Sequence, residues 1–422
     1  MTLTVSDVHA LEILDSRSRP TLAVTLRTAS GTEVKAGVPS GASTGSREAV
    51  ERRDGDAARF NGLGVQGAVS AVNGEILETL RGRSFPDLAT LDEALISLDG
   101  TSDKSRLGAN AIVGVSMAAA RAFAAFEGIP LWRSFAGQVG EARLPVPHFN
   151  VINGGVHAPN SLDFQEFMIA PLGAPNVSAA VRAGSEIYGA LRRLLVERSM
   201  SVGLGDEGGF APEISAPEDV LRLLVEAIET AGYSAGRDGI AIAIDPASSE
   251  FYADGVYRVA GESLSTDDMI ERYAAMVETF PIWLLEDGLS ESDWSGWEKL
   301  TARLGDRIEL VGDDIFCTNP AIISEAVSRN VANSALIKVN QIGTVSETVE
   351  AMRVCRRAGY AQFVSHRSGE TEDSFIADLA VGTGCGHIKS GAPARGERVA
   401  KYNRLMEIEA GGDLPYGLSQ AG

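Results

Sequence analysis

The sequence predicts an α/β protein, a (β/α)8 barrel preceded by a smaller α+β domain. Three observations support this prediction. The chain of 422 residues is too long for one compact core. Strand patterns precede helical patterns over about its first third. After Pro147, short apolar runs alternate with helical segments, and about eight such runs in the remaining chain is the size of a (β/α)8 barrel. An open doubly wound sheet is the alternative, but no Gly-x-Gly-x-x-Gly follows any of these runs.

The N-terminal domain is expected over residues 1–140, with the barrel domain over 141–422 and a joint at the Pro-rich stretch 144–147. Alternating residues predict three antiparallel strands, with a tight turn at 29–31: 5–14, 21–28 and 32–38. Helical spacing follows in three segments: 69–80, 91–98 and 110–126.

The barrel strands are expected where β-branched and other apolar residues form short runs: 148–152, 164–170, 240–244, 282–285, 308–311, 335–337, 362–364 and 386–388. Helical patterns separate most of them: 177–197, 217–231, 266–279, 319–330 and 346–358.

Charge and composition exclude several classes of protein. The net charge is −20, from 37 basic and 57 acidic residues, so a nucleic-acid partner is not expected. We expect no membrane span and no signal peptide, because no apolar run is long enough to cross a bilayer and the first ten residues lack the basic and apolar regions of a leader. Three scattered cysteines predict reduced thiols in a cytoplasmic protein.

Charged residues mark nearly every barrel strand. In chain order these are Glu166, Asp206, Glu207, Asp245, Glu286, Asp287, Asp313, Asp314, Lys338, His366, Arg367 and Lys389. A single charged strand end is best explained as a helix cap or a solvated edge. A series of them is different, because a barrel points its strand ends at one mouth. So many acids there require a cation.

Three carboxylates from consecutive strands, Asp245, Glu286 and Asp313, suit a hard divalent ion such as Mg²⁺. Zinc is disfavoured because no Cys or His lies beside these strand ends. Lys338 is expected next to the metal, where burial and nearby cations would depress its pKa from about 10.4 and make it a usable base.

The guanidinium of Arg367 and the hydroxyl of Ser368 could bind a phosphate group, and Lys389 adds a positive charge. The alternative for Arg367 is a salt bridge at the barrel rim. His148 and His387 are expected to pack inside strands.

Ten motifs then resemble the enolase family along essentially the whole chain: DSR at 15–17, SGASTG at 40–45, NGGVH at 153–157, QEFMI at 165–169, GDEGGF at 205–210, SSEFY at 248–252, VGDD at 311–314, KVNQIGT at 338–344, VSHRSGETED at 364–373 and GAPAR at 391–395. In that superfamily, Mg²⁺ and a Lys or His base remove a proton α to a carboxylate. The resemblance implies an irregular barrel with an N-terminal cap, and dehydration of 2-phosphoglycerate to phosphoenolpyruvate.

By position, the resemblance implies that Asp245, Glu286 and Asp313 hold one Mg²⁺ and that Ser40 helps to hold a second, which arrives with the substrate. Lys338 would take the α-proton. Glu207, its pKa raised by the neighbouring Glu166, would protonate the departing hydroxide. The remaining residues of the pocket would be His157, His366, Arg367, Ser368 and Lys389.

The usual family homodimer is expected, although Leu11, Ala23, Glu407 and Ala410 stand where the family usually has interface Arg–Glu pairs. Two other functions remain open. One is an enolase-like enzyme of specialised metabolism, such as a carboxyphosphonoenolpyruvate synthase. The other is a binding protein without catalytic activity, which the presence of Lys338 and Glu207 disfavours.

Overall fold

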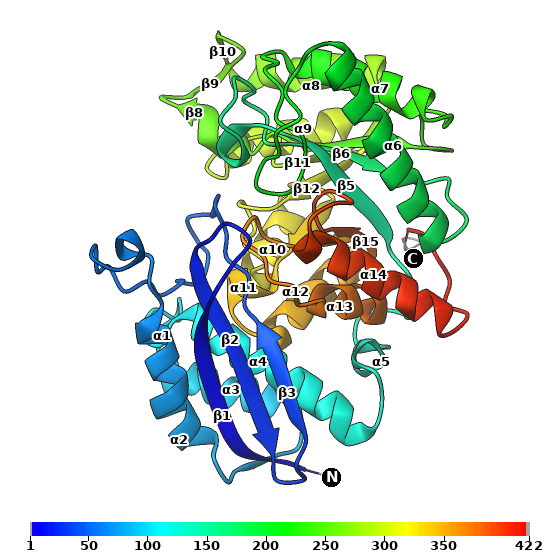
Figure 1. The fold of residues 1–422 in the computed structure, drawn as a ribbon. Helices are drawn as coiled ribbons and strands as arrows, with labels where there is room; N and C mark the ends of the chain where they lie inside the picture. Colours follow the sequence, from blue (N-terminus) through cyan, green and yellow to red (C-terminus); the bar gives the residue numbers. More distant parts are fainter. Residues whose placement is uncertain (1, 419–422) are drawn as a thin grey trace.

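In the computed structural model, which describes residues 2–418, the N-terminal strands form the expected antiparallel sheet (Figure 1). Its order is β3-β2-β1-β4, with β1 Leu3–Leu14, β2 Pro20–Thr28, β3 Glu33–Gly37 and β4 Ser84–Phe85. The two-residue edge strand β4 was not predicted. Gly31, at φ 88°, makes the turn between β2 and β3, where the backbone N–H of Thr28 donates to Thr32.

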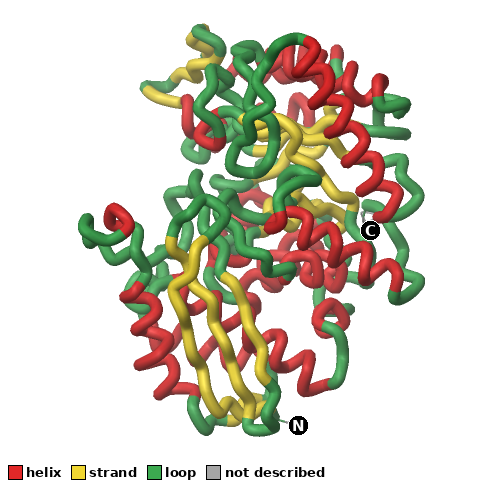
Figure 2. The backbone as a smooth tube through the Cα atoms, viewed as in Figure 1, coloured by secondary structure: helices red, strands yellow, loops and turns green. Residues whose placement is uncertain are grey.

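Helices cover one face of this sheet (Figures 1 and 2). They are α1 Gln66–Ala71, α2 Leu77–Leu80, α3 Leu88–Asp99, α4 Ala109–Glu127 and α5 Leu131–Phe135. Within residues 2–418, α4 is the one helix long and apolar enough to cross a membrane by length and composition. It is a core helix here, since most of it is buried and it packs on β2 and β3. Gly114 permits that approach, because a Cβ there would lie 2.6 Å from a methyl of Val24.

The predicted single helix over 69–80 contains a π-helical turn, Val72–Ile76, between α1 and α2. Asn73 lies in this turn. Its side chain accepts from the backbone N–H of Ala10 at 2.7 Å and donates to the carbonyl of Ala10 at 3.1 Å. The turn therefore docks the helix onto β1, which helical spacing alone does not reveal.

Eight strands close into a barrel in the order β11-β12-β13-β14-β15-β5-β6-β7. They are β5 Val146–Asn153, β6 Glu166–Ala170, β7 Ala241–Asp245, β11 Ile282–Glu286, β12 Glu309–Gly312, β13 Ser334–Ile337, β14 Ala361–Ser365 and β15 Gly386–Lys389. Seven of these strands run parallel to one another, but β6 runs antiparallel to both of its neighbours, β5 and β7. Glu166 is therefore the first residue of its strand, yet it pairs with Asp245, the last residue of β7.

Helices surround the barrel: α6 Val177–Glu197, α7 Pro217–Thr230, α8 Thr266–Thr279, α9 Trp294–Leu304, α10 Pro320–Ser328, α12 Val345–Ala358, α13 Phe375–Thr383 and α14 Gly396–Ala410. Local sequence fixes several of their starts. Pro217 and Pro320 occupy the first turns of α7 and α10, and Ser265 with Asp268 forms a capping box on α8. A small sheet, β8 Tyr252–Ala253, β9 Val256–Val259 and β10 Glu262–Leu264, projects near α8 (Figure 1).

The interior of the barrel is mainly apolar below its charged mouth, with Met168, Ala243 and Leu336 fully buried. His148 and His387 pack there as expected. The ring centroid of His148 lies 4.5 Å from that of Phe363, and the ring centroid of His387 lies 5.6 Å from that of His148. The three cysteines are buried, and no disulfide joins them within the described chain.

One buried acid predicts a pH dependence of stability. Burial raises the pKa of Asp92 from its ordinary value of 3.8 to about 6. A raised folded-state pKa stabilises the fold below pH 3.8, and this contribution is lost as the pH rises through 6. We expect Asp92→Asn to raise the free energy of unfolding at pH 7.5 by up to about 3 kcal/mol, with a much smaller gain at pH 4. Urea denaturation at both pH values tests this, and an equal effect at both would contradict it.

Candidate active site

Buried charges gather at the mouth of the barrel. Asp245 and Glu286 end neighbouring strands, Asp313 follows the next strand, and each of them is at most 5% exposed. Lys338 follows β13 and Lys389 ends β15, and both are buried. The strand ends therefore meet at one mouth, as the sequence predicts.

Two lysines neutralise this cluster of acids. The Nζ of Lys389 lies 2.7 Å from both carboxylate oxygens of Glu286, 3.2 Å from Glu166 and 3.7 Å from Asp245. Burial opposes protonation of Lys389, but Glu166 and Glu286 raise its pKa well above the usual value. Lys389 thus holds three carboxylates together.

A fall in the pKa of Lys338 was expected beside a metal ion, but the contacts in the structure raise this pKa. Its Nζ is hydrogen-bonded to the carboxylate of Asp313. Burial and the cations Arg367 and Lys389 lower the pKa, but the charge of Asp313 beside it produces a net rise. The sequence placed both residues at the mouth but could not show that they pair.

Two sets of three side chains in residues 2–418 bring ligand atoms within 4.8 Å of one another: His157, Glu166 and Glu207, and Asp287, Asp313 and Asp314. The expected metal trio of Asp245, Glu286 and Asp313 is not one of these sets. Each member of the trio faces a lysine instead. Burial, then the charge of Asp245, raises the pKa of Glu286 well above its usual range. Oxygen donors that repel one another in this way fit a hard divalent cation.

Asp287 and Gln341 orient Asp313. Asp287 accepts from the backbone N–H groups of Asp313 at 2.8 Å and Asp314 at 3.0 Å, so both of its oxygens are used within the turn. The Nε2 of Gln341 donates to Asp313 at 2.8 Å. This contact of Gln341 was not predicted, because an amide that follows a strand is not distinctive by itself.

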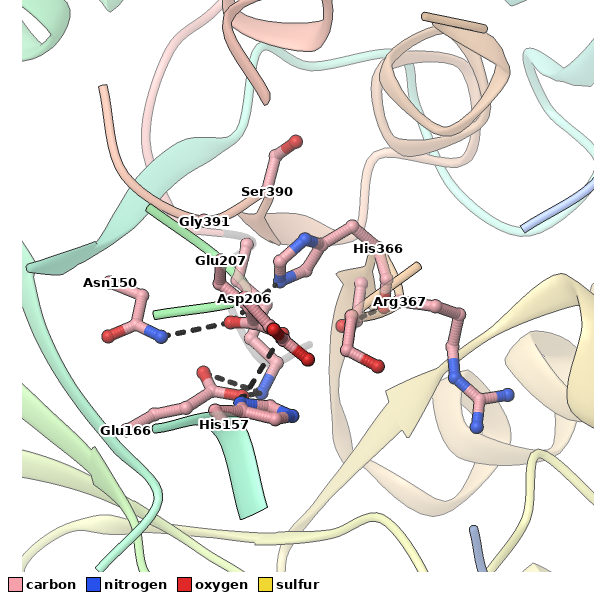
Figure 3. A network of polar contacts seen from close by, with 12 residues as sticks. Asn150, His157, Glu166, Asp206, Glu207, His366, Arg367, Ser390 and Gly391 are labelled. Carbon is pink, nitrogen blue, oxygen red and sulfur yellow. Dashed lines mark hydrogen bonds and ion pairs between the residues drawn. The ribbon is translucent and has the colours of Figure 1, made fainter. Parts of the chain in front are cut away.

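A second group of polar side chains gathers around Glu207 (Figure 3). Glu207 accepts from the Nδ2 of Asn150 at 2.9 Å, lies 3.3 Å from the Nε2 of His366 and lies 3.8 Å from the Nδ1 of His157. Burial lowers the pKa of His157 to about 4 and that of His366 to about 3, so both imidazoles are neutral at pH 7.

The expected rise in the pKa of Glu207 is wrong in this state. Burial alone would raise it, but His366 and His157 bring the pKa well below the usual range. The raised pKa belongs to Glu166, through burial and then the charge of Glu207. The family resemblance placed His157 and His366 in this pocket, but it did not predict that they lower the pKa of Glu207.

Arg398 supports this acidic side from α14, and it was not anticipated. It is fully buried. Its guanidinium donates to His366 Nδ1 and to the carbonyls of Arg367 at 2.7 Å, Ser368 at 2.6 Å and Asp206 at 3.0 Å. A basic residue on a helix gives no sequence signal for such a role.

At the mouth lies a small, partly open cavity, lined by Ser43, His157, Gln165, Glu166, Glu207, Lys338, Ser365, His366, Arg367, Ser368 and Lys389. Several lining atoms have no hydrogen-bond partner among residues 2–418: both ring nitrogens of His157, Oε1 of Gln165 and Oγ of Ser368. Such atoms suit a polar ligand.

Arg367 extends away from Glu207 (Figure 3). It lies 3.0 Å from both oxygens of Glu48 and from Asn340. Ser40, unlike Arg367, is not among the residues that line the cavity. Its hydroxyl donates to Glu51 at 3.1 Å and accepts from Arg53 at 2.9 Å. The segment 40–51 therefore engages both residues in this state.

Comparisons with known proteins agree with this arrangement. Residues 5–135 match the family described as "Enolase, N-terminal domain", and residues 141–414 match "Enolase, C-terminal TIM barrel domain". The chain is 54% identical over 404 residues to a curated protein named "Enolase" from Rubrobacter xylanophilus, an alignment that covers 95% of this chain and 94% of the relative. This protein therefore belongs to the enolase family of carbon–oxygen lyases.

Proposed function

We propose that this enzyme dehydrates 2-phosphoglycerate to phosphoenolpyruvate in glycolysis and gluconeogenesis. The observation that carries the proposal is the placement of Lys338 and Glu207 on the walls of the same small cavity. A base on one wall and an acid on the other suit removal of a proton and a hydroxide from neighbouring carbons. The identity to a curated enolase over nearly the whole chain supports the same reaction.

The donors at the mouth suit Mg²⁺ in this proposal. Asp245, Glu286 and Asp313 would hold one ion, and Ser40 would help to hold a second that arrives with the substrate. Bound Mg²⁺ stabilises the negative charge that develops on the substrate carboxylate. The buried, mutually repelling carboxylates support this assignment.

Lys338 would take the α-proton once its ion pair with Asp313 is exchanged for contacts of Asp313 with metal. Without that negative partner, burial and the cations Arg367 and Lys389 lower the pKa of Lys338, as a base requires. Glu207 would give a proton to the departing hydroxyl after taking that proton from Glu166, which its raised pKa keeps protonated. His157 and His366 would fix the position of Glu207.

The phosphate would be bound by Arg367, Ser368 and Lys389, with His157 and Glu166 completing the substrate contacts. Ser368 already offers an unpartnered hydroxyl. Arg367 would exchange Glu48 for the phosphate, so the 40–51 segment would rearrange as substrate binds.

The proposal includes a cytoplasmic homodimer, with residues 1–140 capping a catalytic domain over 141–422. The partner of the site is a small phosphorylated acid, and neither nucleic acid nor a membrane is part of it. The net charge of −20 supports the exclusion of nucleic acid.

The test is phosphoenolpyruvate formation, followed by ultraviolet absorbance, from purified protein with 2-phosphoglycerate in the presence and absence of Mg²⁺. We expect rapid turnover with Mg²⁺ and a loss of at least about 100-fold after chelation. Phosphonate-containing analogues are assayed beside it. If the folded protein turns over only a phosphonate substrate, the proposal is wrong and the chain is an enolase-like enzyme of specialised metabolism. Absence of Mg²⁺ binding would support a binding protein without catalytic activity.

A further inference from the structure

Side chains from the N-terminal elements hold the first turn of α12. The first amides of a helix have no partner within the helix. Here the N–H of Val345 donates to the hydroxyl of Ser116 on α4 at 2.9 Å, and the N–H of Ser346 donates to the carboxylate of Asp92 on α3 at 3.0 Å. These contacts add to a local cap, in which the hydroxyl of Thr344 accepts from the backbone N–H of Glu347 at 3.2 Å. The start of α12 thus depends on residues far away in the sequence.

Lys104 also contacts the first turn of α12, through an ion pair with Glu347. Its Nζ lies 3.0 Å from Glu347, and the residue is 3% exposed. Glu347 also binds Thr344, the N-cap of α12. Gly343 packs on Lys104 at φ 96°, and a Cβ at this glycine would lie 2.6 Å from the Cδ of Lys104. The joint before α12 therefore fits closely against the N-terminal elements.

The same stretch of chain reaches the active site at its other end. The single turn α11, Val339–Ile342, joins Lys338 to Gly343. Gln341 on this turn donates to Asp313, and Asn340 accepts from Arg367 at 3.0 Å. A displacement of the α12 start would therefore move groups that contact the metal-site acid and the phosphate-site arginine.

We propose that Asp92, Lys104 and Ser116 form an interdomain clasp that holds the start of α12 and thereby positions Lys338 and α11 for catalysis. These three are positioning residues, since none of them lines the cavity of the site. The catalytic part of this inference rests on the proposed function, in which Lys338 is the base.

The test is the double variant Asp92→Ala/Ser116→Ala, which removes both acceptors. We expect kcat to fall at least about tenfold, because small displacements of a base are costly, while KM for 2-phosphoglycerate stays within about twofold. Exchange of the substrate α-proton with D2O, followed by NMR, should slow in parallel with kcat. Asp92→Asn keeps an acceptor for Ser346 and should retain kcat within about twofold.

Thr383→Val is the matched control. It removes a buried hydroxyl that bonds only within α13. It should lose stability without losing kcat. A folded double variant with unchanged kcat, or a loss of kcat equal to that of Thr383→Val, would overturn the clasp. If the double variant does not fold, the kcat of Ser116→Ala alone is compared with that of Thr383→Val. We expect this kcat to fall about threefold below that of the wild type.

Hydrogen exchange of backbone amides provides a readout that does not depend on activity. In the double variant we expect faster exchange over 339–348, with α8 unchanged. If the wild-type protein does not turn over 2-phosphoglycerate, the proposed function fails, and this exchange still decides whether the clasp exists. Unchanged protection over 339–348 would overturn it.

Discussion

Replacing Lys338 by alanine is expected to reduce kcat for 2-phosphoglycerate by about 10⁴-fold, the upper end of what a positioned base contributes. Both α-proton exchange with D2O and phosphoenolpyruvate formation should be lost, because Lys389, the other lysine that the structure places at the mouth, is held by Glu166 and Glu286. NMR and ultraviolet absorbance measure the two reactions on the same preparation.

Lys299→Ala is the control for this variant, since Lys299 is exposed and pairs with Asp267 on the outside of the barrel. It should retain full activity. Retention of more than about a tenth of kcat in folded Lys338→Ala protein would assign the base to another residue.

Replacing Glu207 by glutamine should separate the two halves of the reaction. Glutamine keeps an oxygen for the Nδ2 of Asn150 but cannot give up a proton. Phosphoenolpyruvate formation should therefore fall by about 10²- to 10⁴-fold. Exchange of the α-proton should persist within about tenfold of wild type, because Lys338 is unchanged.

Glu213→Gln provides the matched control. Glu213 lies with Glu207 in the segment between α6 and α7, but it is exposed, and its side chain bonds only to Ser161 among the contacts described. If Glu207→Gln abolishes exchange as well as dehydration, Glu207 is not simply the acid. The roles of Glu207 and Glu166 would then need to be exchanged, in line with the raised pKa of Glu166.

Much of this architecture could be predicted from the sequence. The runs at 282–285 and 335–337 coincide with β11 and β13, because buried parallel strands are short and continuously apolar. The acids and lysines that follow such runs were therefore placed correctly at one mouth. The direction of β6 could not be predicted, since an apolar run has no preferred sense. If β6 ran parallel to its neighbours, Glu166, as its first residue, would lie at the end of the barrel opposite the mouth.

The states of the charged groups were harder to predict than their positions. The pKa of Lys338 depends on whether the carboxylate of Asp313 contacts the lysine or a metal. A small shift in the position of that carboxylate decides between the two. Ser40 and Arg367 were assigned to the site, but Glu51 and Glu48 engage them here. Spacing along the chain determines which groups meet, whereas the partner that each group chooses depends on the surrounding three-dimensional contacts.

Arg398 gives the last long helix an importance that its place near the end of the chain conceals. Its guanidinium joins α14 to the segments that carry Asp206 and His366. Nicking by a protease or a premature stop codon before α14 would therefore remove the brace of the acid side, and not merely trim the surface. If Glu207 donates the proton as proposed, an intact α14 is a requirement for that step.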